Sequence, residues 1–382
     1  MDRWLDHMVT LDPAAPMDAA LRQLPPRWAV YLTADEHGTP VQLLAVKNLR
    51  ASIKRRLGES AEGAGRRVDY RAIVRQIHWK RVDSAFESDL TYLDTARIAF
   101  PANYRQIVSA RRAWFMEINP DAPFPRWMRT DEPSGKCPTF GPMLEKSHAG
   151  KLVETIEDLF DLCRYHNVLV QSPGGSACAY KDMGKCPAPC DGSVSMQQYR
   201  SLIDWSIHTL ADPEQEIAEQ TDRMQSAAGD LRFELAQKIR QFAEGLDSLR
   251  KNEWRHVRPL ADFRYLSVQP GPGKGLARLF AITPQEVRCI ACLRGEEREL
   301  ILHCDDAQAL MQARPAIALD PVSLDALGIV ARHLLSPKST GVFLHGNDLS
   351  DRAIVQAYRQ IARQATPLVE TDDEGVVAEL SA

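Results

Sequence analysis

The sequence predicts a multidomain α/β protein, and three observations support this fold class. The chain has 382 residues, which is more than one compact core usually holds. Short β-like runs alternate with helical patterns near both ends of the chain. Between them lie a dense group of cysteines and a long apolar stripe at helical spacing. We therefore expect a small mixed α/β domain, a cysteine-ligated metal domain, a helical hairpin and a second small α/β domain.

The composition is that of an ordinary soluble globular protein, with 44% hydrophobic and 26% charged residues and a net charge of −4. No apolar run is long enough to span a bilayer. The first residues lack the basic-then-apolar build of a secretory signal. We expect a cytoplasmic protein, and in that reducing compartment eight cysteines favour metal binding over disulfides.

The first α/β unit is predicted from two β-like runs, Trp28–Thr33 and Val41–Val46, joined by the turn-forming sequence DEHGTP. A basic helix is expected from Leu49 to Leu57. A second helix is expected from Ala85 to about Phe100, where Pro101 ends it.

This unit carries a basic face although the whole chain is acidic. Between Lys47 and Arg81, eleven Lys and Arg stand against three acids, a local excess of eight positive charges. Such a face suits contact with a phosphate backbone, and a solvated helix surface is the alternative. The candidate DNA-binding residues are Lys47, Arg50, Lys54, Arg55 and Arg56.

The central part of the chain begins with a proline-rich stretch, 115–142, that reads as loop, and a helix then leads from Gly150 toward the cysteines. Four of them follow the spacing C-x14-C-x7-C-x3-C, at Cys163, Cys178, Cys186 and Cys190. Glycine and proline force turns between them, so the thiolates can converge on one small volume. An iron–sulfur cluster or a zinc ion would suit such a site.

The stretch 213–255 carries one apolar stripe with helical spacing, from Met224 to Leu249. Gly229-Asp230 interrupts it and suits the turn of a helical hairpin. The hairpin would bury its stripe against itself or against a partner helix. The candidate partner-binding residues are Leu231, Phe233, Glu234, Leu235, Ile239 and Phe242.

After Arg258 the pattern returns to short β-like runs, at Tyr265–Val268, Ala277–Ile282, Val287–Leu293 and Leu300–Cys304. Helices are expected near 323–335 and 350–364, with GVFLHG between them as a strand. Cys289 and Cys292 lie in one of the β-like runs. Since residues three apart on a strand point to opposite faces, we interpret them as ordinary core cysteines.

These elements together resemble UvrC, the nuclease component of the bacterial ABC excinuclease, and its shorter relative Cho. CAYKDMGKCPAPC followed by VSMQQY resembles the family's cysteine block, and RMQSAAGDLRFELAQKIRQFAEGL resembles its UVR motif. TFGPM at 139–143 resembles the Gly-Pro turn before the cysteine domain. Residues 28–104 resemble the GIY-YIG nuclease domain, and VYL and KNLRASIKRRL stand for its first motif and basic helix. The family's RNase H-like and helix-hairpin-helix parts have no counterpart here.

The resemblance places the catalytic residues of a GIY-YIG site at five positions, and only the first-motif tyrosine is retained, as Tyr31. The others are replaced by Gln42, Ala45, Ser52 and Tyr92, where the family has a tyrosine, a lysine, an arginine and a metal-holding glutamate. Serine removes a fixed cation, and a phenol does not replace a carboxylate on a hard metal. We therefore expect a degenerate nuclease domain.

The resemblance also implies a [4Fe-4S] cluster on the four cysteines, with zinc as the alternative. Mg²⁺ or Mn²⁺ is implied only if the nuclease site is active. The implied partners are DNA and, through the hairpin, UvrB. Three functions follow: a DNA-binding repair protein without nuclease chemistry, an active Cho-like endonuclease, or an iron–sulfur interaction or redox-sensing protein.

The expected domain boundaries combine these patterns. They are an N-terminal extension at 1–25, a degenerate GIY-YIG-like domain at 26–110, a linker and four-cysteine domain at 111–210, a UVR-like hairpin at 211–257, a small α/β domain at 258–365 and an acidic tail at 366–382.

Overall fold

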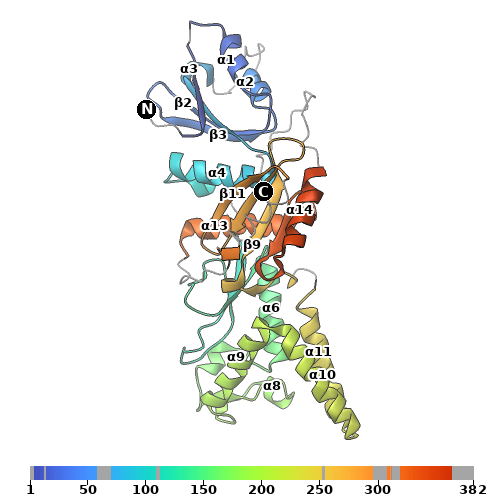
Figure 1. Ribbon diagram of the computed structural model, residues 1–382. Helices are drawn as coiled ribbons and strands as arrows, with labels where there is room; N and C mark the ends of the chain where they lie inside the picture. Colours follow the sequence, from blue (N-terminus) through green and yellow to red (C-terminus); the bar gives the residue numbers. More distant parts are fainter. Residues whose placement is uncertain are drawn as a thin grey trace.

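The computed structural model describes residues 4–12, 14–57, 70–108, 112–251, 254–295, 308–309, 311 and 319–363. Over these residues the chain is a mixed α/β protein with three four-stranded sheets. Figure 1 shows the N-terminal sheet at one end, the cysteine segment and a long helical hairpin at the other, and the C-terminal unit between them. The expected strand Leu300–Cys304 and the acidic tail lie outside the described residues. No described helix has the length and apolar character needed to cross a membrane.

The N-terminal unit is an antiparallel sheet in the order β1-β4-β2-β3 with helices on both faces. Its elements are β1 (His7–Thr10), α1 (Met17–Gln23), β2 (Ala29–Ala34), β3 (Pro40–Val46), α2 (Leu49–Leu57), α3 (Tyr70–Ile73), β4 (Gln76–Arg81), α4 (Ala85–Ala99) and α5 (Tyr104–Val108). Residues 1–25 are not a separate extension over their described part, because β1 pairs with β4 and α1 packs on the same core. Four residues of β1 are too few for a periodic signal.

The middle unit holds a second sheet, where the sequence predicts loop. Its strands are β5 (Trp114–Glu117), β6 (Met128–Thr130), β7 (Thr139–Met143) and β8 (Arg258–Pro259), in the order β6-β5-β7-β8. The expectation that 115–142 is loop is therefore wrong at β5, β6 and β7 and holds for 118–127 and 131–138, and TFGPM is a buried strand and not a turn. A side chain at Gly141 would collide with the Phe115 ring, 2.6 Å from where its Cβ would lie.

The remaining helices of this unit surround one core. They are α6 (Lys146–Leu159), α7 (His166–Leu169), α8 (Ala179–Asp182), η1 (Pro189–Asp191), α9 (Met196–Ala211), α10 (Pro213–Gly229) and α11 (Phe233–Ser248). Ser195 and Gln198 form a capping box that fixes the start of α9. The helices α10 and α11 are the expected hairpin, and the turn lies at Gly229-Asp230 as predicted.

The C-terminal unit is an antiparallel sheet in the order β11-β10-β9-β12 between two helices. Its elements are η3 (Leu260–Asp262), β9 (Tyr265–Pro270), β10 (Ala277–Ile282), β11 (Val287–Leu293), α13 (Pro321–Leu335), β12 (Val342–His345), η4 (Gly346–Asp348) and α14 (Asp351–Arg363). One sheet face packs with α13 and the other with α14. Cys289 and Cys292 are both exposed, so the interpretation of them as core residues is wrong.

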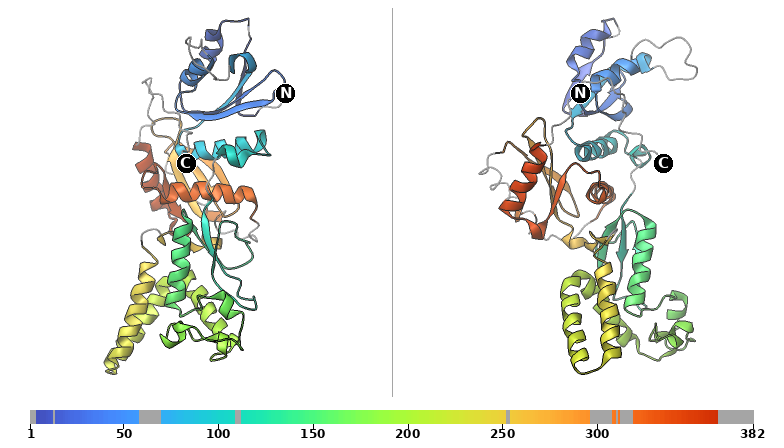
Figure 2. Two further views of the ribbon diagram at one scale, coloured as in Figure 1. Left: turned by 180° about the vertical axis from the view of Figure 1, so that it is seen from behind. Right: turned by 90° about the vertical axis from the view of Figure 1, so that its right-hand side faces the viewer.

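The C-terminal unit packs directly on α4 of the N-terminal unit, as both views of Figure 2 show. Phe86 of α4 makes edge-on contacts with Phe280 and Phe343. Arg278 pairs with Asp83 at 3.1 Å and with Glu87 at 3.2 Å. The two units therefore share one apolar core rimmed by ion pairs.

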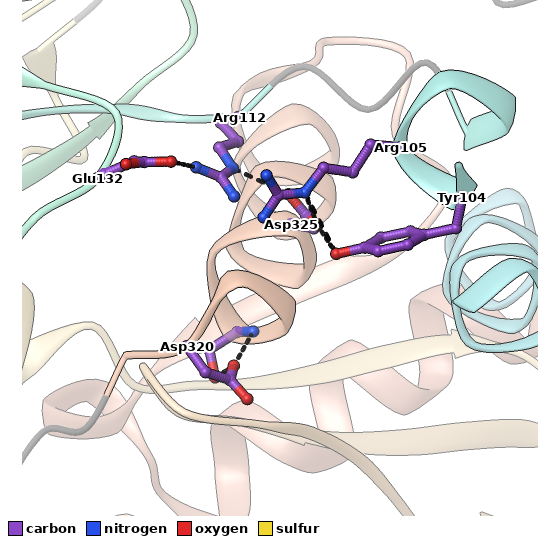
Figure 3. A network of polar contacts seen from close by, with 7 residues as sticks. Tyr104, Arg105, Arg112, Glu132, Asp320 and Asp325 are labelled. Atoms are coloured by element: carbon purple, nitrogen blue, oxygen red, sulfur yellow. Dashed lines mark hydrogen bonds and ion pairs between the residues drawn. The ribbon is translucent and has the colours of Figure 1, made fainter. Parts of the chain in front are cut away.

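A buried carboxylate on α13 ties this core to the segment that leads into the middle unit (Figure 3). The Asp325 side chain is 2% exposed and accepts hydrogen bonds from the Tyr104 hydroxyl at 2.9 Å and from Arg112 Nε at 3.0 Å. Arg112 also pairs with Glu132, close to β6. This network joins all three units at one point.

Candidate functional site

The residues at the five expected catalytic positions lie on two sides of the sheet, with Tyr31, Gln42 and Ser52 on the α2 side and Ala45 and Tyr92 on the α4 side. Side chains alternate across a strand, so Tyr31 of β2 packs toward α1 and α2 while its neighbour Val30 packs toward α4. Ser52 joins Tyr31 on the α2 side. Ala45 and Tyr92 belong to the core on the α4 side. The sheet itself therefore separates the two groups.

Tyr31 is enclosed by the α2 side of the sheet and is 0% exposed. Its hydroxyl lies 3.2 Å from the Ser52 Oγ. Burial raises the pKa of Tyr31, and the opposing effects of Ser52, Arg56 and Arg55 are smaller. A neutral, enclosed phenol with a raised pKa is a poor group for activating water at neutral pH.

Tyr92 stands where a metal-holding carboxylate is expected, and it serves the fold. Its hydroxyl donates to the Leu43 carbonyl at 3.3 Å. Two nearby carboxylates on α4 are already engaged: Glu87 with Arg278, and Asp89 with His333 at 2.9 Å. Glu87 and Asp89 are therefore not available to a divalent metal, whereas Asp94, two residues from Tyr92, is exposed.

The candidate DNA-binding residues differ in how exposed their side chains are. Lys47, Lys54 and Arg55 are exposed. Arg50 Nε donates to the Leu24 carbonyl at 2.9 Å, and Arg56 Nη1 donates to Gln42 Oε1 at 3.2 Å. The first three present a cationic surface at the start and end of α2, and the other two help to hold α2 on the sheet.

Three of the four block cysteines gather in the core of the middle unit. Cys163, Cys186 and Cys190 are buried, and Cys178 is half-buried at the start of α8. The thiols of Cys163 and Cys186 share a hydrogen bond, which together with burial raises the pKa of Cys163. The same hydrogen bond lowers the pKa of Cys186 to about 6. Cys190 lies near enough for its charge to act on Cys163.

The backbone around these thiols is held by specific contacts. Ser172 Oγ donates to the Pro189 carbonyl at 2.6 Å, and the Gly175 amide donates to the Cys190 carbonyl at 2.8 Å. The Cys163 amide donates to the Tyr199 hydroxyl at 3.2 Å. Across the described residues, no three His, Cys, Asp or Glu side chains stand in metal-binding geometry. The donor set still fits a thiophilic metal, because free thiols from separate segments adjoin one another.

The hairpin divides the candidate partner-binding residues into an exposed tip and a packed base. Leu231, Phe233 and Leu235 are 73%, 65% and 43% exposed, and Glu234 is exposed beside them. At the base, Ile239 is buried and Phe242 stacks on Trp205 with ring centroids 5.0 Å apart. Phe242 thus packs within this chain.

A groove of about 1010 Å³ runs between the hairpin and the cysteine loop. Its lining includes Lys185 and Cys186 of the loop, Trp205 of α9, Arg223 of α10 and Phe242 of α11. Sequence reasoning missed this groove and the stacked Trp205. Leu202 and Trp205, three residues apart in α9 and both in the groove lining, were the available signal.

Comparison with known proteins gives a family for the middle of the chain. Residues 113–209 match the family model described as the UvrC/Cho excinuclease middle domain. No solved structure matches.

Curated relatives extend this similarity. The UvrABC system protein C of Nautilia profundicola is 26% identical over 238 residues, which cover 60% of this chain and 38% of the relative. That of Syntrophotalea carbinolica is 25% identical over 224 residues, covering 57% and 36%. That of Legionella pneumophila is 24% identical over 330 residues, covering 84% and 49%. The chain thus spans between a third and a half of the length of these relatives. By its middle domain and these relatives, this is a UvrC/Cho-like protein.

Proposed function

We propose that this chain is a DNA-binding protein associated with nucleotide excision repair whose N-terminal nuclease fold no longer cuts. The observation that carries the proposal is the state of Tyr31, which is fully enclosed and bonded to Ser52 at the position of the family's arginine. Tyr92, on the other side of the sheet, adds no carboxylate. These two observations support the proposal that the nucleophile-activating and metal-holding groups of a phosphodiesterase are not assembled on this domain.

A cutting assay tests the loss of activity. Lesion-bearing duplex DNA is incubated with the purified chain and Mg²⁺ or Mn²⁺, with and without UvrA and UvrB. We expect the duplex to stay intact. Metal-dependent cleavage that Tyr31→Phe abolishes would instead establish the alternative, an active Cho-like endonuclease.

The exposed cations Lys47, Lys54 and Arg55 support the DNA-binding part of the proposal. Each phosphate contact releases a counterion, so affinity falls steeply with salt. We expect Lys54→Glu with Arg55→Glu to weaken duplex binding at least about tenfold and to flatten the salt dependence by about two ion equivalents. Fluorescence anisotropy across a salt series measures both.

The matched control is Lys151→Glu with Lys238→Glu, which makes the same change in net charge at exposed residues of α6 and α11. Equal losses in both double variants would mean that net charge alone governs binding. In that case the face on α2 would not be the DNA-binding surface.

We further propose that Cys163, Cys178, Cys186 and Cys190 hold a [4Fe-4S] cluster, with zinc as the alternative. The support is that three of these thiols are buried and free and that two of them, Cys163 and Cys186, share a hydrogen bond. Such a metal would stabilise the fold of the middle unit and needs no role in cutting. Ultraviolet–visible spectra with iron, sulfide and zinc analysis of anaerobically purified protein decide between the two. Less than one metal per chain would overturn the assignment.

The hairpin tip supports the proposed docking to UvrB. Leu231 follows α10 with a φ of 60°, where a left-handed residue closes the helix end and glycine is favoured. An exposed leucine there costs the fold stability, which suggests selection for contact with a partner. We expect Leu231→Gly to stabilise the hairpin by about 1 kcal/mol and still weaken UvrB binding.

The experiment for this tip is a pull-down with UvrB alongside thermal unfolding. Phe233→Ser provides a second tip variant, and Gln237→Ser, on an exposed part of α11, provides the control. Undiminished UvrB binding by both tip variants would remove the docking proposal. If the docking proposal fails in this way, the alternative is a redox-sensing or other interaction role for the cysteine block.

A further inference from the structure

Cys289 and Cys292 lie on the same face of β11, although they are three residues apart. In the pairing with β10, Cys289 is opposite Phe280 and Cys292 is opposite Arg278. The register shifts between these pairs, so β11 carries one residue more than β10 over this stretch. A β-bulge of this kind reverses the alternation of side chains beyond it.

The surroundings of the strand agree with this register. Ile290 and Ala291, between the cysteines, both pack against the core on the α14 side. Arg278 points to the opposite side, where it contacts Asp83 and Glu87. Cys289 receives a side-chain hydrogen bond from Arg278, which places its thiol on that side too.

Both thiols are accessible. Cys289 and Cys292 are exposed, and β11 is the outermost strand of the sheet over the residues that the structure covers. Burial raises the pKa of the Cys289 thiol, and Arg278 acts in the opposite direction. The guanidinium offsets only part of this rise, so less of the Cys289 thiol is in the thiolate form that exchange chemistry uses.

The spacing suits a disulfide. Arg278 and Phe280, opposite the two cysteines, are two residues apart on an extended strand, a distance of about 6.6 Å. The Cα atoms of disulfide-bonded cysteines are about 4.4–6.8 Å apart. Because the bulge puts both side chains on one face, the two thiols can meet without a change of strand pairing.

We propose that Cys289 and Cys292 are a redox-active dithiol that closes to a reversible disulfide by exchange with small-molecule disulfides of the glutathione type. One cysteine thiolate attacks oxidised glutathione, forming a mixed disulfide and releasing one glutathione thiolate. The second cysteine thiolate then attacks the protein sulfur of that mixed disulfide and releases the second glutathione. The pair loses two electrons and two protons, and one glutathione disulfide becomes two thiols. This chemistry is independent of DNA binding and of the cysteine block.

The sequence provides a direct readout. Trypsin cuts after Arg288 and Arg294, so the peptide CIACLR contains both cysteines and no others. The whole chain is equilibrated with reduced and oxidised glutathione in varied ratios, quenched with acid, alkylated and digested. We expect the peptide to shift cooperatively from a doubly alkylated form to one that is two hydrogens lighter than the dithiol, and dithiothreitol to reverse the shift. Cys289→Ser and Cys292→Ser should instead each carry one glutathione.

A position control tests the role of the bulge. In Ala291→Cys combined with Cys292→Ala, the cysteines are closer in sequence but face opposite sides, since Ala291 is opposite Leu279. We expect this variant to form glutathione adducts and no internal disulfide, with its circular dichroism unchanged. Closure in this variant as readily as in the wild type would overturn the geometric argument. A wild-type peptide that stays doubly alkylated, or carries glutathione without closing, would overturn the proposal itself.

Discussion

The N-terminal sheet and the cysteine block differ in whether their polar side chains and thiols are bonded within the fold. In the sheet, the side chains at the catalytic positions serve the fold: Tyr31 bonds to Ser52 and Tyr92 bonds to the Leu43 carbonyl. In the block, Cys163, Cys186 and Cys190 are free and buried, and the thiols of Cys163 and Cys186 share a hydrogen bond. The polar side chains of the sheet are thus bonded within the fold, whereas the buried thiols of the block are not joined in disulfides.

The largest expected effect concerns the cysteine block. If the proposed metal is present, Cys186→Ser removes a ligand from the core and should unfold the middle unit, because metal-binding free energy of about 10 kcal/mol or more contributes to folding. Limited proteolysis would show new cleavage within 113–209. Cys137→Ser, at a half-buried free cysteine outside the block, is the control. If both variants resist proteolysis equally, the cysteine block and the N-terminal sheet would not differ in the way described above.

The next effect concerns the network that joins the units. Asp325→Ala leaves Arg112 without its buried partner, since the Arg112 side chain is only 12% exposed. We expect a loss of about 3–5 kcal/mol in the free energy of unfolding, measured by urea denaturation. Asp351→Ala, at an exposed residue of α14, should cost less than about 0.5 kcal/mol. A small loss at Asp325 would mean that the two regions fold independently of this junction.

A smaller effect is expected at the Tyr31–Ser52 pair. Tyr31→Phe removes one partner of a buried hydrogen bond, which costs about 1–2 kcal/mol. Tyr31→Phe with Ser52→Ala removes both partners and should cost no more than the single change. Thermal unfolding of Tyr31→Phe, Ser52→Ala and the double variant gives this cycle. Additive losses would show that the two hydroxyls act separately, contrary to a purely structural pair.

An effect of similar size is a pH dependence at the base of the middle unit. Burial, with Arg255 and Arg258, lowers the pKa of His256 to about 4. The unfolded chain therefore binds a proton that the folded chain rejects as pH falls from about 6.5 to 4. We expect stability to decline over this range by about 1–3 kcal/mol, and His256→Gln to flatten that decline. Urea denaturation at pH 7.5 and 5 measures it, and an unchanged slope in the variant would contradict the assignment.

Much of the local structure follows from the sequence. The helix expected at Leu49–Leu57 has those bounds, and the hairpin turn lies at Gly229-Asp230. Such features are determined by apolar periodicity, caps and turn residues within a few positions of one another. The resemblance to the UvrC/Cho family also rested on contiguous motifs, and the comparisons confirm it.

Other features depended on contacts between distant segments. The strands of the middle sheet are too short for a periodic pattern, and β8 joins β7 from far along the chain. The face on which Cys292 lies depends on a bulge that only the pairing with β10 reveals. The separation of Tyr31 from Tyr92 depends on which helix covers which face of the sheet. The sequence by itself determined the elements and the family, and the tertiary structure decided which side chains meet, because pairing and burial are set by long-range packing.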